Sequence, residues 1–403
     1  MTDDDPLSGG LKRAEFDLPD GVVYLDGNSL GPLPKTVKAR IGGVVEDEWG
    51  GMLIRGWNQA GWIDLPARVG AKIGRLIGAP EESVMVGDST SVNLFKALNA
   101  ALDLVPERGV ILSDSGNFPN DLYIAQGVAA SRKGCQLKIV EPEAVAGGID
   151  ESVAVLMLTE VDYRTGRLHD MAALTDMAHK AGALALWDLA HSAGAFPIDL
   201  TAAGADFAVG CGYKYLNGGP GAPAFIYIRR DHAGQVNPLL SGWLGHEAPF
   251  AFDPDYRPAE GINRMIVGTP PILSLSALDS ALDLWMDVDL AEIRVSSIAL
   301  SELFIAEVED KCAGFGLALA SPRAPEQRGS QVSFRHEEGY AIMQALIAEG
   351  VIGDFRAPDL MRFGFAPLYN TSEDVLAAVG ALADILRDRR WDCEQFKARA
   401  KVT

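Results

Sequence analysis

Lys214 is the residue whose surroundings most clearly predict chemistry. It lies in the run CGYKYLNGGPGAP (211–223), between two tyrosines and just before a glycine-rich turn. A short apolar strand is predicted before this run, so the ammonium group is expected near apolar and aromatic surface. Partial desolvation of a lysine favours the free amine that forms Schiff bases. The ordinary alternative is a lysine whose amine reaches solvent, and this run alone leaves both readings open.

A carboxylate is predicted close to Lys214. In ALALWDLAHSAGAF, Asp188 follows a buried type of strand. Open α/β sheets present ligand-binding groups at the carboxyl ends of their strands. A carboxylate there is what a pyridoxal phosphate site needs to keep the pyridine nitrogen protonated. Taken singly, Asp188 is better explained as a helix cap or a loop salt bridge, and His191 as a packed histidine.

Two further segments offer groups that could bind a ligand. Ser89, Thr90 and Ser91 precede a predicted helix, whose free N–H groups and positive dipole end favour phosphate, although N-capping explains them equally well. Phe118 and Asp121 follow a predicted strand, where an aromatic ring can stack on a planar cofactor. The alternative is a hydrophobic staple with Asp121 as the cap. No G-x-G-x-x-G opening a helix after a strand and no G-x-x-x-x-G-K-[ST] motif is present.

Arg362 is the candidate for binding a substrate. It lies in the apolar run DLMRFGFAPLYN. The fork of a guanidinium group suits bidentate binding of a carboxylate. An internal salt bridge is the alternative, and the sequence leaves both open.

The elements that must position these residues follow an α/β pattern. Between residues 89 and 229, short apolar runs alternate with amphipathic segments, which indicates parallel strands joined by crossover helices. Strands are predicted at 110–112, 137–140, 153–159, 183–187, 207–209 and 224–228, and helices at 91–104, 121–130 and 170–181, the last with Asp170 as N-cap. Beyond Pro271 the prediction is long helices at 273–284 and 290–308, a polar connector at 321–330, a strand at 331–335 and a helix at 340–349.

Composition and charge exclude several classes of protein. The chain has 403 residues, 48% of them hydrophobic and 22% charged, which is typical of a globular protein with room for two domains. A net charge of -20 disfavours a nucleic-acid partner. The cysteines have neither disulfide nor zinc spacing, so we expect a reducing cytoplasm and no metal; they are Cys135, Cys211, Cys312 and Cys393. The acidic first ten residues predict no secretory leader, and no apolar stretch reaches the ~20 residues of a membrane helix.

Together these residues resemble the kynureninases, fold-type I pyridoxal phosphate enzymes of the class V aminotransferase group. The resemblance covers nearly the whole chain in order, through the runs YLDGNSLGPLP (24–34), RGWNQAGW (55–62), DSTSVNLFKAL, NFPND, VDYRTG, WDLAHSAGA, CGYKYLNGGPG, SGWLGH (241–246), VGTPPILS and MRFGFAPLYN. The pairing of DLAHSAG with YKYLNGGPG is the specific part. The resemblance implies an α/β fold in which a large cofactor-binding domain (51–271) contains a mainly parallel seven-stranded sheet. A smaller α+β domain (272–403) and an N-terminal segment (1–50) that packs with it complete the chain.

The resemblance also implies roles for single residues. Lys214 matches the lysine that holds pyridoxal phosphate and moves the Cα proton, Asp188 the partner of the pyridine nitrogen, and Tyr213 a phosphate-binding residue and proton relay. Trp243 and Thr269 match positions that complete the phosphate cup from the neighbouring subunit of a homodimer. The other matches to the cofactor site are Thr90, Ser91, Phe118, Asp121, Thr159 and His191, and the matches to the substrate site are Arg362, Trp57 and Ser29.

The activity implied by the resemblance is hydrolysis of L-kynurenine to anthranilate and L-alanine in the breakdown of tryptophan or in NAD biosynthesis. Animal relatives that prefer 3-hydroxykynurenine carry His and Asn where this chain has Trp57 and Thr269. Because burying an unpaired hydroxyl costs about 1 to 3 kcal/mol, we expect a preference for L-kynurenine. One alternative is a cysteine desulfurase, with Cys312 as the candidate thiol, although the position of Cys312 favours a structural role. The other is a regulator that senses pyridoxal phosphate, which would normally carry a basic nucleic-acid-binding module.

Overall fold

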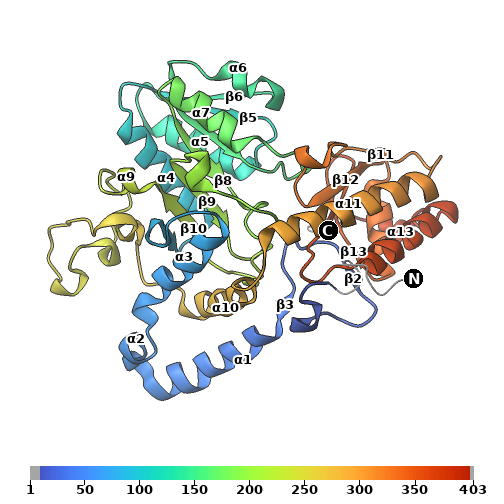
Figure 1. Cartoon of the computed structure of the whole chain (residues 1–403), viewed down its shortest axis with the longest axis horizontal. Helices are drawn as coiled ribbons and strands as arrows, with labels where there is room; N and C mark the ends of the chain where they lie inside the picture. The colour runs from blue at the N-terminus through green and yellow to red at the C-terminus, as the bar shows by residue number, and fades with distance from the viewer. Residues whose placement is uncertain (1–9, 400–403) are drawn as a thin grey trace.

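A seven-stranded sheet forms the centre of the larger part of the molecule, as the computed structural model of residues 10–399 shows (Figure 1). Residues 1–9, for which the sequence predicts no secretory leader, lie outside the described residues. The sheet has the order β4-β10-β9-β8-β7-β5-β6. Its strands are β4 (Val84–Val86), β5 (Val110–Asp114), β6 (Gln136–Val140), β7 (Val153–Thr159), β8 (Leu184–Asp188), β9 (Phe207–Cys211) and β10 (Ala224–Ile228). All neighbours pair in parallel except β10, which is antiparallel to β9 and β4, so the predicted mainly parallel sheet is confirmed.

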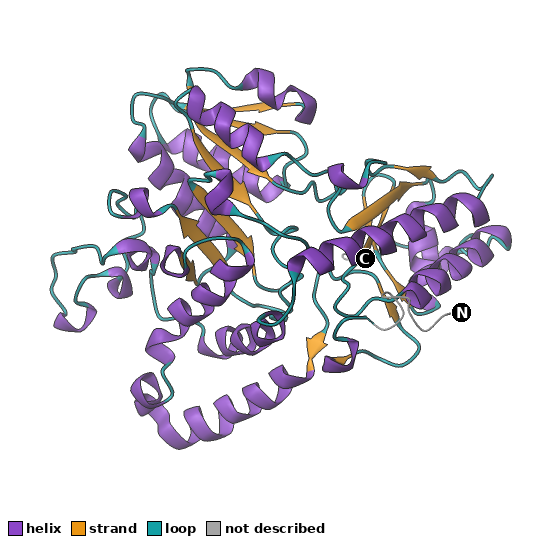
Figure 2. Cartoon of the chain, viewed as in Figure 1, coloured by secondary structure: helices purple, strands orange, loops and turns teal. Residues whose placement is uncertain are grey.

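Helices cover both faces of this sheet (Figure 2). In β7, Val155 and Met157 belong to one buried cluster, whereas Leu156 and Leu158 belong to another. Successive side chains of a strand point to opposite faces, so each cluster lies on its own face, and burial on both faces explains the continuous apolar runs. The first cluster includes side chains of α4 (Thr90–Leu104) and α5 (Pro119–Ser131), and the second those of α3 (Leu65–Leu76), α7 (Met171–Lys180) and α10 (Ile272–Leu282).

The C-terminal part is a smaller α+β unit with its own buried cluster. Its antiparallel sheet has the order β11-β12-β15-β14, with β11 (Ala318–Leu319), β12 (Gln331–Arg335), β14 (Asp354–Arg356) and β15 (Leu360–Gly364). The helices that pack there are α11 (Leu290–Lys311), α12 (Gly339–Ala348), α13 (Ser372–Arg387) and the short α14 (Glu394–Lys397). Within residues 10–399, no helix has the length and apolarity needed to span a bilayer.

The N-terminal segment contacts both parts. Strand β2 (Val23–Tyr24) pairs in parallel with β13 (Val351–Ile352) of the C-terminal part. Helix α1 (Lys35–Gly43) instead packs on α10, and Figure 1 shows α1 and α2 (Gly56–Gln59) as an arm that extends away from the sheet. Because α10 packs with the core of the large sheet, a boundary after α10 fits this packing better than one before it. The predicted division at 1–50, 51–271 and 272–403 stays a prediction.

Most predicted elements exist, and their ends differ by up to three residues. The strands predicted at 153–159, 224–228 and 331–335 are confirmed, and each begins and ends at the predicted residues. Asp170 caps α7, since its side chain accepts a hydrogen bond from the Ala173 N–H at 2.9 Å. Strand β4 and the two-residue strands β1 (Phe16–Asp17), β2 and β3 (Leu33–Pro34) were not predicted, because segments this short carry no periodicity.

Candidate active site

A cavity of about 520 Å³ lies at the carboxyl ends of β7, β8 and β9. Parallel strands place their carboxyl ends at one edge of the sheet, which is where α/β proteins bind ligands. The predicted residues that line this cavity are Thr90, Ser91, Phe118, Asp121, Thr159, Asp188, His191, Tyr213 and Lys214. The structure therefore brings together most of the predicted cofactor site in one place.

Lys214 is held against the N-terminal segment and against a histidine. The Gly31 N–H donates to the Tyr213 carbonyl at 2.8 Å, and a Cβ at Gly31 would lie 2.4 Å from the Lys214 carbonyl oxygen, so only glycine fits there. The Lys214 Nζ lies 3.0 Å from the His191 Nε2. Burial, followed by the charge of Lys214, lowers the pKa of His191 well below its usual value. The neutral imidazole therefore accepts a hydrogen bond from the lysine amine.

Asp188 and Asp121 form a buried pair of carboxyl groups in the cavity. Burial raises the pKa of both, and the charge of Asp188 raises that of Asp121 further, whereas the charge of Lys214 opposes the rise at Asp188. The Asp188 Oδ1 accepts from the Ala190 N–H at 2.8 Å, while the Asp121 Oδ2 has no hydrogen-bond partner among the described residues. A buried pair of carboxyl groups fits the protonated ring nitrogen of a pyridine cofactor, with Asp188 as the predicted partner of that nitrogen.

Aromatic side chains also line the cavity, namely Phe118, Tyr163 and Tyr213. Phe118 is 44% exposed and packs edge-on against Tyr163, with ring centroids 5.1 Å apart, so a planar ring has an apolar surface to cover. The Lys214 Nζ lies 5.8 Å from the centroid of the Tyr213 ring. Burial and the neighbouring Cys211 raise the pKa of Tyr213 above its usual value, so its phenol keeps its proton.

The start of α4 provides the end of the cavity that suits a phosphate. The Ser89 Oγ accepts from the Val92 N–H at 3.3 Å and caps the helix, which leaves the N–H groups of the first turn at the cavity. The Ser91 hydroxyl donates to the Asn120 Oδ1 at 3.1 Å. Together with Thr90, these groups fit a phosphate.

Arg362 forms the internal salt bridge that the sequence left open. It is 1% exposed, and its Nε donates to the Asp354 Oδ1 at 2.8 Å while its Nη2 donates to the Asp354 Oδ2. Its Nη2 also donates to the Ser29 Oγ at 2.8 Å, and its Nη1 to the Tyr163 carbonyl at 2.5 Å. Tyr163 lines the Lys214 cavity, so the arginine lies directly behind the wall of that cavity. A bidentate contact with a substrate carboxylate requires the Ser29 or Tyr163 bond to be replaced.

Besides Arg362 and Ser29, three predicted residues do not line the cavity of their own chain. Trp57 is on the arm and packs against Trp62 at a centroid distance of 5.9 Å. Trp243 is exposed and contacts Phe250, and Thr269 lines a separate small cavity. The resemblance implies a position in the neighbouring subunit's site for Trp243 and Thr269, but not for Trp57. Their roles stay predictions.

Three residues of the site were not singled out from the sequence. Tyr163 belongs to the quoted run VDYRTG, but nothing in the run indicates that its carbonyl binds Arg362. Asp354 and Arg356 lie on β14, and the antiparallel register places Asp354 directly opposite Arg362. The Arg356 Nη2 lies 2.7 Å from the Asp354 Oδ2, which adds a second cation to the cluster. A hairpin prediction at 354–364 would have revealed the pairing.

The buried Glu160 is expected to make the stability of the protein depend on pH. Its side chain is buried next to the end of β7, its Oε2 has no partner among the described residues, and burial raises its pKa to about 7. Above its unfolded value of 4.5, the unfolded chain loses a proton that the folded chain keeps. Stability therefore falls as the pH rises from about 4.5 to about 7, by up to about 3 kcal/mol, and then levels off.

Glu160→Gln is expected to remove this pH dependence. The variant's free energy of unfolding should match the unaltered chain near pH 4.5 and exceed it by up to about 3 kcal/mol above pH 7, as measured by urea unfolding across that range. Glu326→Gln, at an exposed position, serves as the control and should show no such divergence. If the free energies of unfolding of Glu160→Gln and the unaltered chain differed by the same amount at every pH, the raised pKa of Glu160 would be contradicted.

Comparisons with known proteins identify the family of this chain. The family profile described as "Kynureninase C-terminal domain" matches residues 293–382. Kynureninase from Pseudomonas fluorescens is 52% identical over 397 residues, covering 97% of this chain and 95% of its own, and kynureninase from Burkholderia mallei is 50% identical over 406 residues, covering 99% and 97%.

Solved structures show the same fold. A cystine C–S lyase with glycine covalently linked to its pyridoxal phosphate matches with a TM-score of 0.81 at 20% identity, covering 93% of this chain and 99% of that one. A cysteine desulfurase from Thermococcus onnurineus NA1 matches with a TM-score of 0.78, also at 20% identity, covering 93% and 97%. At such identities the likeness concerns the fold alone. Because the chain is 52% and 50% identical to these two kynureninases over nearly its whole length, it belongs to the kynureninase family of pyridoxal-phosphate-dependent hydrolases that cleave carbon–carbon bonds in ketonic substances.

Proposed function

We propose that this chain hydrolyses the Cβ–Cγ bond of L-kynurenine to give anthranilate and L-alanine. The observation that carries the proposal is the single cavity in which the Lys214 amine lies with the buried acids Asp188 and Asp121, directly in front of Arg362. The identity of about half of all residues with two kynureninases supports the choice of substrate.

The roles of the chain's own groups follow from their surroundings. When bound, pyridoxal phosphate supplies an electron sink for the bonds that break at the substrate. Asp188 would keep the ring nitrogen protonated, since an ion pair at hydrogen-bond distance is worth on the order of 5 kcal/mol before desolvation is subtracted. The Lys214 amine, with neutral His191 as its hydrogen-bond acceptor, moves the proton at the substrate Cα. The Tyr213 phenol holds a proton beside it and serves as a donor in the later steps.

Arg362 and Ser29 orient the amino-acid end of the substrate. Arg362 has five N–H groups, and its contacts to Asp354, Ser29 and the Tyr163 carbonyl use four of them. An incoming α-carboxylate takes the remaining N–H together with the one that Ser29 now accepts. Arg356, 34% exposed and tied to Asp354, adds positive charge at the same place.

Trp57 and Thr269 set the preference for the aryl ring of the substrate. Because both lie outside the cavity of their own chain, this role requires a site shared between two subunits. We expect kcat/KM for L-kynurenine to exceed that for 3-hydroxy-L-kynurenine by about tenfold or more, since no partner for the ring hydroxyl is provided.

Steady-state kinetics on both substrates measure this ratio. The double variant Trp57→His with Thr269→Asn should lower it, whereas Trp49→His, at an exposed position on the same arm, should leave it unchanged. Equal values for the two substrates in the unaltered chain, or a preference for the hydroxylated one, would contradict the expected role.

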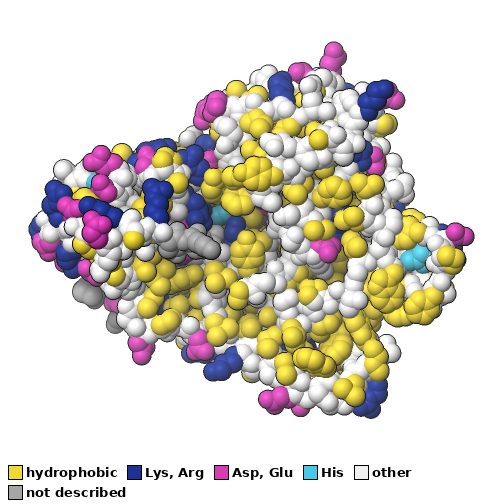
Figure 3. All heavy atoms as spheres, turned by 180° about the vertical axis from the view of Figure 1, so that it is seen from behind, with side chains coloured by type: hydrophobic (Ala, Val, Ile, Leu, Met, Phe, Trp, Pro, Cys, Tyr) yellow, Lys and Arg dark blue, Asp and Glu magenta, His cyan; other side chains and the backbone are white. Residues whose placement is uncertain are grey.

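A homodimer is part of the proposal. Exposed apolar side chains lie on the arm, among them Ile54 at 77%, and on the loop between α9 (Arg230–Ala233) and α10, among them Phe252 at 78%. Figure 3 shows hydrophobic side chains gathered along the lower and right-hand parts of one face of the molecule. Patches of this kind mark protein interfaces. Sedimentation equilibrium checks the mass, and a monomer at all concentrations would contradict the dimer.

The cellular setting is proposed on chemical grounds. The four free cysteines fit a reducing cytoplasm, and the net charge of -20 supports the absence of a nucleic-acid partner. Cleavage of L-kynurenine places the enzyme in tryptophan catabolism, in the kynurenine pathway, with NAD biosynthesis as the alternative use of its products.

One experiment tests the reaction. The visible spectrum of the purified protein should change on mixing with L-kynurenine, and anthranilate fluorescence should appear in step with L-alanine. Release of sulfide from cysteine would instead indicate a desulfurase. Against that alternative, Cys312 is buried at the end of α11, and burial raises the pKa of its thiol to about 11.

A further inference from the structure

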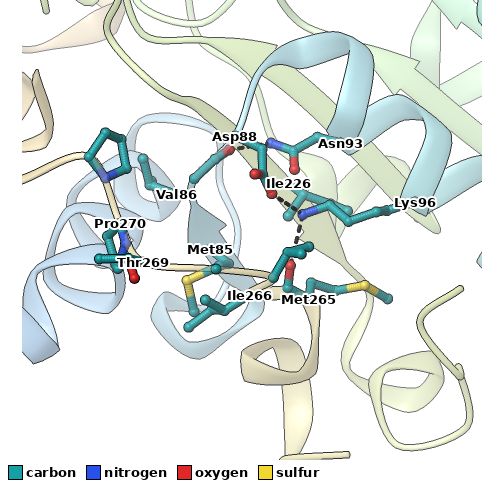
Figure 4. A pocket seen from close by; sticks show the side chains of 14 residues that line it. Met85, Val86, Asp88, Asn93, Lys96, Ile226, Met265, Ile266, Thr269 and Pro270 are labelled. Atoms are coloured by element: carbon teal, nitrogen blue, oxygen red, sulfur yellow. Dashed lines mark hydrogen bonds and ion pairs between the residues drawn. The ribbon is translucent and has the colours of Figure 1, made fainter. Parts of the chain in front are cut away.

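An ion pair between a buried lysine and an exposed aspartate lies beneath the turn that leads into α4. The Lys96 side chain is 2% exposed, and its Nζ donates to the Asp88 Oδ2 at 2.9 Å and to the Met265 carbonyl at 2.7 Å (Figure 4). These residues line a small cavity of about 60 Å³, separate from the Lys214 cavity, and Asp88 lines both. Burial lowers the pKa of Lys96, so the charged amine depends on its acidic partner.

The backbone of Asp88 is fixed in an uncommon conformation. Its φ is 55°, in the left-handed region, which side chains other than those of Gly, Asn and Asp rarely adopt. Its carbonyl accepts from the Ala224 N–H at 3.0 Å, and the Asn93 Nδ2 donates to the Gly87 carbonyl at 2.9 Å. The chain reverses here, so that Ser89 becomes the cap of α4. The position of Asp88 therefore decides where the helix start meets the Lys214 cavity.

The negative charge of Asp88 would weaken binding of the phosphate expected at the start of α4. A carboxylate beside the helix start repels a phosphate, and the whole chain already carries a net charge of -20. The Lys96 amine pairs with the Asp88 carboxylate and neutralises its charge, but Lys96 does not line the Lys214 cavity. The same amine also holds the Met265 carbonyl, at the start of the segment that carries Thr269 (Figure 4).

We propose that Lys96 is a positioning residue for the cofactor phosphate, acting through Asp88. It cancels the carboxylate charge at the phosphate end of the cavity, holds the turn at 88–91, and ties that turn to the segment expected to reach the neighbouring subunit's phosphate. The inference rests on the proposed phosphate site at Thr90 and Ser91.

The test compares pyridoxal 5'-phosphate with pyridoxal, which differs only in having no phosphate. Equilibrium dialysis of the full-length protein gives the Kd of each aldehyde. Lys96→Met should weaken binding of pyridoxal phosphate by roughly tenfold to a hundredfold, because an unpaired carboxylate then faces the phosphate, and should change pyridoxal binding by less than about threefold. The double variant Lys96→Met with Asp88→Asn should recover most of the loss, because it removes the repelling charge as well.

The controls separate this role from a general effect on folding. Lys72→Met removes a lysine paired with Asp279 and Asp283 elsewhere in the large part and should leave the ratio of the two affinities unchanged. Equal losses for both aldehydes in Lys96→Met, no loss for the phosphate form, or no recovery in the double variant would overturn the inference. If the unaltered chain binds both aldehydes equally, the phosphate site itself is wrong, and the role of Lys96 falls with it.

Discussion

Lys214→Ala is expected to abolish covalent attachment of the cofactor and to lower kcat by at least about four orders of magnitude. Enzymes that lose the group forming a covalent intermediate show losses of this size. In this chain the Lys214 amine is the amine that lines the cavity with Asp188 and Asp121, within the described residues. Borohydride reduction followed by peptide mass spectrometry locates the attachment, and single-turnover kinetics measure the loss.

The control for this substitution is Lys180→Ala. Lys180 is an exposed lysine paired with Asp176 one helical turn away, so its removal should leave both attachment and turnover unchanged. Reduced coenzyme found on a peptide that does not contain Lys214 would show that the wrong amine has been assigned.

Asp188→Asn is expected to lower kcat by about three orders of magnitude while the coenzyme stays bound to Lys214. The ion pair of on the order of 5 kcal/mol is lost, because an amide cannot hold the ring nitrogen in its protonated form. Burial raises the pKa of Asp188 and the charge of Lys214 opposes the rise, so a cation beside Asp188 favours its charged form. Loss of the Cα proton in deuterium oxide, followed by NMR, isolates the step that should slow.

Asp121→Asn provides the matched comparison within the same pair of carboxyl groups. Asp121 is buried beside Asp188, and its Oδ1 already accepts a hydrogen bond from the Asn120 side-chain amide at 3.4 Å. We expect its loss to cost at least tenfold less than that of Asp188, since it acts on the ring nitrogen only through its neighbour. The reverse order of effects would mean that the two acids exchange roles.

The large sheet could be predicted from the sequence because its strands carry strong local signals. Strands β7 and β10 are buried apolar runs on both faces and end at polar or glycine-containing turns. The first strands carry no such signal, since β2 has two residues and depends on contacts far along the chain. The Asn370 amide, for example, donates to the Tyr24 carbonyl across 346 positions.

The part of the candidate site that lies at the ends of the sheet's strands could be predicted from the sequence. Asp188 ends β8 and Lys214 follows β9, and these neighbouring parallel strands bring their ends to the same edge. The surroundings of Arg362 were not predictable, because Arg362 and its partner Asp354 lie on an antiparallel hairpin of which neither strand was predicted. Glu160 carries no signal at all, since its altered pKa comes from burial without a charged partner.

The position of the N-terminal segment has a consequence for how the molecule is made. Gly31 closes on the backbone of Lys214, yet Val23 and Tyr24 are held by residues 351–352 and by Asn370. On the ribosome, residues 23–24 cannot take these positions until residues 351–370 have emerged. The large sheet can assemble first, and the segment that carries Gly31 can be held against the Lys214 backbone only afterwards, so a chain cut before residue 351 lacks the contacts that hold this segment.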